Sequence, residues 1–265
     1  MVAATPRRVN VLGVGVSAIT MAEALAHIDR WIAADAREYV CVTGVHGVME
    51  SHGDARLRDI HNQAGLVTPD GMPLVWVSRW QGHAHVERVY GPDLMLACCE
   101  AGLPKGYRHF FYGGAPGVPE RLVARLKQRF PGLRIAGTWS PPFRELTPAE
   151  ERDLVEAIAA ARPHIVWVGL STPKQERWMA RLVGTLPAPV LIGVGAAFDM
   201  HAGVTKQAPR WMQRSGLEWL FRLGSEPRRL WRRYLVNNPR FVWRLLLQSS
   251  GLAHYELRPV PDRSD

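Results

Sequence analysis

Residues 164–169 read HIVWVG, and residues 190–195 read VLIGVG. Both runs are short, almost wholly apolar and end in glycine, which is typical of strands buried on both faces of a sheet. Further strands are expected at Arg8–Val14, Tyr39–Thr43, Gly65–Thr68, His109–Tyr112 and, more weakly, Leu133–Ala136. Helical apolar spacing or helix-start signals lie between several of these runs, notably in Ser17–Ile32, Gly117–Arg129 and Thr147–Ala161. Strands that alternate with helices predict an α/β fold, a Rossmann-like, mostly parallel sheet with helices on both faces.

Length and composition bound the class of protein. A chain of 265 residues with 47% hydrophobic and 22% charged residues can form one large domain with a full core. The three cysteines are odd in number, and Cys98 and Cys99 are adjacent, so a reducing compartment is expected. The uncharged stretch Val9–Ala22 is too short to span a bilayer. A signal peptide is the alternative for this stretch, since Arg7 and Arg8 precede it, but strand, turn and helix start explain it more simply. We therefore expect a cytoplasmic protein.

The positive charge of the chain is concentrated near its end. The whole chain carries +9, and Lys206–Arg244 holds ten basic residues against Glu218 and Glu226 alone, a balance of +8. Tryptophan and leucine alternate with these arginines, which predicts a basic amphipathic helical appendage over residues 208–265 on a core of residues 1–207. Such a segment is suited to an anion, and its apolar positions favour contact with an anionic membrane surface. We expect the protein to be peripheral on the inner face of the cell membrane.

A glycine pattern near the start offers another function. Gly13-Val-Gly15-Val-Ser-Ala18 fits the loose dinucleotide-binding fingerprint, but the second expected strand ends in Thr43-Gly44 without the acidic residue that would hold a ribose. A tight strand-to-helix turn is the favoured interpretation, and a dinucleotide-dependent oxidoreductase stays an alternative. A second alternative is a nucleic-acid-binding protein that uses the basic aromatic segment for phosphate contacts and base stacking.

Polar residues follow several of the expected strands. Ligands of parallel sheets bind at the carboxyl ends of the strands, where Thr43, Asp70, Gly113-Gly114, the residues after Gly169, and Asp199 lie. Asp70 stands in a Pro-Asp-Gly turn, from which a carboxylate can accept a proton from a reacting hydroxyl. The alternative is an aspartate that only caps its own turn.

Five segments together carry a resemblance to a known family. They are TPDGMPLVW (68–76), ERVYGPDLM (87–95), FYGGAPGV (111–118), VGLSTPKQERWM (168–179) and the stretch that begins GVGAAFDMH at residue 193. In this order the chain resembles the WecG/TagA/CpsF family of glycosyltransferases (glycosyltransferase family 26) from about Val9 to Tyr234. The resemblance implies transfer of a sugar from a UDP-sugar donor to a polyprenyl-diphosphate-linked acceptor in bacterial surface polysaccharide or teichoic acid synthesis. The sugar is N-acetylmannosamine, its uronic acid or glucose, and the expected reaction inverts the anomeric carbon.

The resemblance also implies roles for particular residues. Asp70 matches the proposed catalytic base, and the arginines matched to the UDP leaving group are Arg222, Arg229 and Arg232. No two aspartates have the Asp-x-Asp spacing of many metal-dependent transferases, and arginines can neutralise a diphosphate instead. We expect neither a metal nor another cofactor. We expect Arg228 and Arg233 to be solvated or lipid-facing charges.

Further substrate-binding positions carry over with less chemical support. They are Thr43, Arg88, Gly113, Gly114, Gln175 and Asp199. The chain departs from the family where many members have Thr-x-Asn, because Val45 and His46 follow Thr43-Gly44 here. This difference bears on the donor sugar, and His46 is a candidate to compensate for the lost amide. No nucleic-acid partner is expected, and a homo-oligomer is possible.

Overall fold

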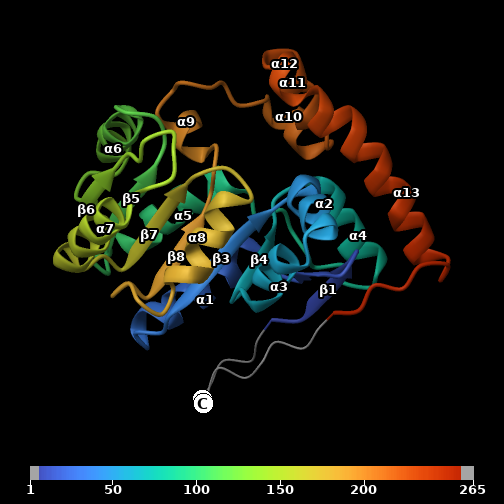
Figure 1. The fold of residues 1–265 in the computed structure, drawn as a ribbon, viewed down its shortest axis with the longest axis horizontal. Coiled ribbons are helices and arrows are strands. Elements are labelled where there is room, and N and C mark those ends of the chain that lie inside the picture. The colour runs from blue at the N-terminus through green and yellow to red at the C-terminus, as the bar shows by residue number, and fades with distance from the viewer. Residues whose placement is uncertain (1–5, 258–265) are drawn as a thin grey trace. The chain divides into compact units, whose positions relative to one another are not determined.

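The computed structural model describes residues 6–257, which form two compact units that alternate along the chain (Figure 1). The first unit contains residues 6–20, 43–90 and 207–257 of this described part. The second unit contains residues 21–42 and 91–206.

The second unit holds most of a parallel sheet. Its strands are β3 (Glu38–Thr43, whose last residue belongs to the first unit), β5 (Arg108–Gly113), β6 (Arg134–Trp139), β7 (Ile165–Gly169) and β8 (Val190–Gly193). They follow the order β3-β8-β7-β5-β6, and each neighbouring pair is parallel. The strand β4 (Leu66–Pro69) belongs to the first unit. A mostly parallel sheet with helices around it confirms the expected α/β fold class.

The burial of the strands follows their apolar sequences. Every residue of β8 and the first four residues of β7 are buried, whereas β6 is partly exposed along its length. The weaker apolar signal of β6 therefore corresponds to an edge strand. Trp167 and Phe111 are among the largest fully buried side chains, and the Phe111 ring lies 5.9 Å from the ring of Phe198.

The helices of the second unit begin at recognisable sequence signals. They are α1 (Met21–Ala33), α5 (Gly91–Gly102), α6 (Val118–Arg129), α7 (Pro148–Ala161), α8 (Lys174–Leu182) and α9 (Ala197–His201). Thr147 and Glu150 form a capping box at the start of α7, as the Thr-Pro-Ala-Glu sequence predicts. Cys98 and Cys99 are buried in α5, and burial raises the pKa of both thiols, so they behave as core residues.

The first unit combines a short hairpin, β4 and the C-terminal helices. Its other elements are β1 (Arg8–Val11), β2 (Val14–Ser17), α2 (Val45–Gly53), α3 (Ala55–Gln63), α4 (Met72–Trp80), α10 (Arg210–Arg214), α11 (Glu218–Ser225), α12 (Pro227–Trp231), the π-helical turn η1 (Arg232–Val236) and α13 (Asn237–Ser249). The helical segment expected near the C-terminus is therefore present.

The start of the chain differs from the expectation of one strand followed by a helix from Ser17. β1 and β2 form an antiparallel hairpin, and the first helix begins only at Met21. Leu12 and Gly13 both have positive φ, 53° and 86°, which is the requirement of a tight two-residue hairpin turn. Gly15 lies inside β2, so the glycine pattern lacks the strand–turn–helix setting of a dinucleotide-binding loop. The glycine pattern therefore no longer supports a dinucleotide-dependent oxidoreductase.

The C-terminal segment is tied to this hairpin. The Leu12 N–H donates to Oε1 of Gln248 (2.9 Å), and Nε2 of Gln248 donates to the Asn10 carbonyl oxygen (3.0 Å). One side chain of α13 thereby satisfies two backbone groups of the hairpin region. Residues 207–257 belong with the hairpin, α2 and α4 in one unit, while the expected division into 1–207 and 208–265 stays a prediction.

Candidate active site

Asp70 lies at the carboxyl end of β4, directly before helix α4. Its main-chain N–H donates a hydrogen bond to the carbonyl oxygen of Thr43 (3.0 Å), and Thr43 itself is buried. Its Oδ2 lies close to Gly44, since a Cβ placed there would be 3.8 Å from this oxygen. Gly44 precedes α2 and Gly71 precedes α4, so the carboxylate is beside two helix N-termini. The partial positive charge of a helix N-terminus favours the ionised carboxylate, the form that a general base requires.

Arg88 holds the main chain of Asp70 from the other side. Its Nε donates to the Asp70 carbonyl oxygen, and its Nη2 forms an ion pair with Oε2 of Glu218. The guanidinium carbon lies 3.9 Å above the ring of Tyr90, whose hydroxyl donates to Oε1 of Glu218 (2.9 Å). Burial opposes the charge of Arg88, but Asp70 and Glu218 raise its pKa overall. The guanidinium therefore stays charged beside the candidate base.

Two more arginines, Arg222 of α11 and Arg233 of η1, lie half-buried near Asp70. The Nε atom of each is buried and has no hydrogen-bond partner among residues 6–257. Burial, together with the neighbouring charge of Arg222, lowers the pKa of Arg233. Tyr234, Glu218, Tyr90 and Asp70 raise the pKa of Arg222 against the effect of burial. A pair of partly buried guanidinium groups with unused donors is suited to a multiply charged anion.

His46, the second residue of α2, faces the same two arginines. Burial, followed by the charges of Arg233 and Arg222, lowers the pKa of His46 to about 3. The imidazole is thus neutral near pH 7, and its 3.7 Å approach to Glu50 is no ion pair there. His46, the candidate to compensate for the amide lost at Val45, accordingly lies near Arg222 and Arg233.

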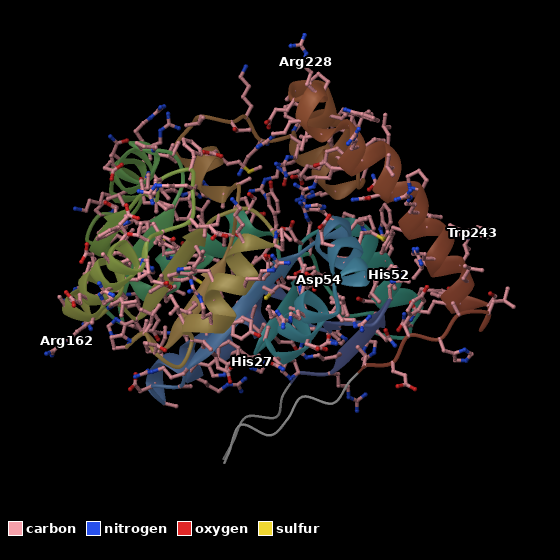
Figure 2. The ribbon with its side chains drawn as sticks, viewed as in Figure 1. His27, His52, Asp54, Arg162, Arg228 and Trp243 are labelled. Carbon is pink, nitrogen blue, oxygen red and sulfur yellow. The ribbon has the colours of Figure 1, made fainter. Side chains whose placement is uncertain are left out.

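The remaining arginines of the C-terminal segment lie at the surface. The Arg229 side chain is 65% exposed and pairs with Glu226 (2.6 Å), while Arg232 is exposed and lies 5.2 Å from the ring of Trp231. Figure 2 shows Arg228 directed outward from the ribbon at α12. The binding of substrate by Arg229 and Arg232 stays a prediction.

The interpretation of Arg233 as a solvated or lipid-facing charge was wrong, because its side chain is half-buried and its Nε atom is buried. The wider π-helical turn at Arg232–Val236 changes the direction in which successive side chains point after α12. A π-helical turn leaves no signal in the regular α-helical spacing of the sequence.

The second unit holds the other predicted substrate-binding residues. Gly113, with φ +129°, ends β5, and a Cβ there would lie 2.5 Å from the carbonyl carbon of Gly169. Gly114, with φ +73°, donates its N–H to the Gly169 carbonyl oxygen (3.1 Å). The close approach of β5 and β7 requires glycine at residue 113, whereas a Cβ on Gly114 would lie 3.0 Å from the side chain of Val118. The amide of Gly114 is engaged within the protein, and nucleotide contact at this turn stays a prediction.

Gln175 lies at the start of α8 and is 3% exposed. Its Nε2 donates to Oε1 of Glu176 (3.0 Å), which also accepts from the hydroxyl of Thr172 (2.9 Å). Asp199 lies in α9, and its carbonyl oxygen accepts the N–H groups of Val204 and Thr205 at 2.8 and 3.2 Å. These bonds tie Asp199 to the turn that follows α9. Nucleotide binding by Gln175 and by Asp199 stays a prediction.

Two further findings concern metals and membranes. Among residues 6–257, no group of three or more His, Cys, Asp and Glu side chains is placed to hold a metal ion. No helix in the same part of the chain has both the length and the apolar character needed to cross a bilayer.

Comparison with known proteins identifies the family. Residues 9–254 match the glycosyl transferase WecG/TagA/CpsF family. The chain belongs to this family. The chain is also similar to proteins named N-acetylglucosaminyldiphosphoundecaprenol N-acetyl-beta-D-mannosaminyltransferase from two bacilli. The protein of Bacillus spizizenii (strain ATCC 23059 / NRRL B-14472 / W23) is 33% identical over 208 residues, and that of Bacillus subtilis (strain 168) is 30% identical over 207. Each match covers 78% of both chains.

Membership of the WecG/TagA/CpsF family confirms the resemblance found in the sequence and makes this protein a glycosyltransferase. The two named relatives transfer N-acetylmannosamine to a lipid-linked N-acetylglucosaminyl diphosphate, as their names state. Within the first unit, the structure brings Thr43, Asp70, Arg88 and Arg222 together in one cluster.

Proposed function

We propose that the protein transfers N-acetylmannosamine from a UDP-sugar to a hydroxyl of a polyprenyl-diphosphate-linked saccharide, with inversion at the anomeric carbon. The observation that carries the proposal is the Asp70 carboxylate at a strand end, surrounded by arginines of the same unit. The names of the two relatives favour N-acetylmannosamine over its uronic acid and glucose, and they favour an undecaprenyl-diphosphate acceptor.

The reaction assigns one task to each charged group. The acceptor oxygen attacks the anomeric carbon while Asp70 accepts the hydroxyl proton, and the bond from that carbon to the diphosphate oxygen breaks. Negative charge then develops on the departing UDP. Arg222 and Arg233 supply fixed positive charge with unused donors, and a charge-assisted hydrogen bond is stronger than a neutral one. Arg229 and Arg232 are proposed to add contacts with UDP.

The acceptor lipid implies work at a membrane surface. The C-terminal helices expose large apolar side chains among their arginines, namely Trp211, Leu220, Trp231, Leu235, Val242, Trp243 and Leu246. A basic segment with tryptophan and leucine binds anionic lipid surfaces. We place the protein in the cytoplasm, on the inner face of the cell membrane.

A donor screen tests the function. The purified protein is incubated with a short-chain lipid diphosphate N-acetylglucosamine acceptor and each of the three UDP-sugars, and the lipid product is measured by mass spectrometry. We expect the N-acetylmannosamine donor to give the largest product, with the β-linkage seen in the nuclear magnetic resonance spectrum. Absence of product from all three donors would contradict the proposal, and an α-linkage would contradict inversion.

A further inference from the structure

Glu218 is one of two acidic residues between Lys206 and Arg244, and its role differs from that of a surface charge. It begins α11, where a carboxylate suits the helix dipole, yet its side chain is only 14% exposed. Both oxygens are used by side chains, Oε2 by Arg88 and Oε1 by Tyr90. Burial raises the pKa of the Tyr90 hydroxyl, and Glu218 raises it further, so this hydroxyl remains a donor.

The contact of Glu218 with Arg88 leads directly to the candidate base. The Nε of Arg88 donates to the carbonyl oxygen of Asp70, whose N–H is bound to the Thr43 carbonyl oxygen. The main chain of Asp70 is therefore held on both sides, by β3 through Thr43 and by α11 through Arg88 and Glu218. These bonds restrict the backbone dihedrals that aim the Asp70 carboxylate.

The same contact docks the helix that carries Arg222. Residues four apart lie on one face of an α-helix, so fixing Glu218 at the start of α11 also sets the position of Arg222. Arg222 is near enough to Glu218 and Asp70 that both raise its pKa. The half-buried Glu218 carboxylate thus contacts Arg88, which holds the main chain of Asp70, and lies one helical turn from Arg222, which faces the leaving anion in the proposed reaction.

We propose that Glu218 is a positioning residue, which couples the docking of α11 to the orientation of Asp70 through Arg88. Without this carboxylate, Arg88 is free to turn from the Asp70 carbonyl oxygen to the Asp70 carboxylate and to block the base. Three arginines would also face a single carboxylate, and their mutual repulsion would loosen α11. The inference about catalysis rests on the proposed function, whereas the inference about docking does not.

The kinetic test replaces Glu218 by Gln, which keeps the shape of the side chain and removes its charge. We expect kcat to fall about 100-fold, the scale of an ångström-sized misplacement, while KM for the acceptor stays unchanged. Glu256→Gln, an exposed glutamate of the same unit, is the matched control and should keep wild-type kcat. In a double-mutant cycle, Glu218→Gln with Arg88→Ala should lose no more than the worse single variant, because the two residues act as a unit. The proposal would be overturned if the losses in kcat of the two single variants multiplied in the double variant, or if Glu218→Gln kept the wild-type kcat.

A second measurement does not depend on activity. Hydrogen–deuterium exchange of the free protein should be faster in Glu218→Ala than in wild type at residues 70–74 and 218–225, and unchanged in Glu256→Gln. Unchanged exchange at both segments would overturn the docking. If wild type transfers no sugar, the proposed function fails, while the exchange result still decides whether Glu218 docks α11. Tyr90→Phe removes one bond to Glu218 and provides a milder variant should Glu218→Ala fail to fold, with kcat about 10-fold lower.

Discussion

The N–H of Asp70 donates a 3.0 Å hydrogen bond to the carbonyl oxygen of Thr43, which joins the ends of β3 and β4. The sequence indicated each residue separately, as a polar position at the end of an apolar run. The bond shows that the two positions are neighbours in the first unit and that the candidate base is fixed through its main chain. Its carboxylate is then directed by backbone geometry instead of by side-chain contacts alone.

Replacement of Asp70 by Asn should abolish most transfer and leave UDP binding intact. The amide has nearly the same shape but cannot accept a proton from the acceptor hydroxyl, and general base catalysis contributes about 10²–10⁴-fold. The rate of UDP release measures sugar transfer, and calorimetric titration with UDP measures UDP binding. Asp35→Asn, at an exposed position with φ 49° that asparagine tolerates, is the control. Wild-type activity in Asp70→Asn would exclude this residue as the base.

The arginines of the C-terminal segment should differ in their effect on UDP affinity. Arg222→Ala and Arg233→Ala each remove a half-buried guanidinium with an unused donor, and we expect UDP to bind about 10–100-fold more weakly. Arg228→Ala removes an exposed charge and should change the affinity little. Isothermal titration of the single variants, with Arg229→Ala and Arg232→Ala beside them, ranks the five positions. If UDP affinity fell more in Arg229→Ala and Arg232→Ala than in Arg233→Ala, the UDP leaving group would be bound by the residues expected from the sequence.

His46 should make the fold sensitive to mild acid. Its pKa is lowered from 6.5 to about 3 in the folded state, so the unfolded chain binds a proton more readily as the pH falls below 6.5. The linkage therefore destabilises the protein progressively from pH 6.5 towards pH 3, by up to about 2 kcal/mol at pH 5. In His46→Gln, chemical denaturation at pH 7 and pH 5 should show a smaller loss than in wild type. The exposed His254→Gln serves as the comparison, and equal losses in wild type and His46→Gln would contradict the assignment.

Gly113→Ala should destabilise the protein severely. The alanine Cβ would lie 2.5 Å from the Gly169 carbonyl carbon at a backbone φ of +129°, so both overlap and dihedral strain oppose it. We expect a loss of roughly 2–5 kcal/mol in the free energy of unfolding. Gly184→Ala, where the added Cβ has no neighbour within 4 Å, should be nearly neutral. Thermal and denaturant unfolding of the two variants give the comparison, and near-equal stabilities would show that β5 and β7 can separate at this point.

Exposed apolar side chains of α13 should govern binding to lipid. Trp243 and Leu246 are 62% and 57% exposed, and Figure 2 shows Trp243 on the outer side of α13. The double change Trp243→Ser and Leu246→Ser should weaken sedimentation with vesicles that contain anionic lipid, while transfer to a water-soluble acceptor analogue is retained. Phe143→Ser, an exposed apolar residue of the second unit, is the control. Equal binding of all three proteins would argue against a membrane role for this surface.

The strands of the sheet were predictable because each is a short apolar run that its neighbours bury, and β3, β4, β5, β7 and β8 lie within two residues of the expected ends. The hairpin at residues 8–17 was not, since one glycine permits both a strand-to-helix turn and a reversal of the chain. The reversal was decided by the left-handed conformation of Leu12 and by contacts with distant residues such as Asn62 and Gln248.

The sequence by itself determined the family, the α/β class and the position of Asp70 at a strand end, because these follow from local runs, spacings and motifs. Only the tertiary structure decided which arginines meet that carboxylate. A π-helical turn places Arg233 near Arg222, and the half-buried Glu218 holds Arg88 on the main chain of Asp70. Such contacts join residues up to 130 positions apart. The local sequence pattern does not show them, because they depend on the burial and the charges of residues that are distant along the chain.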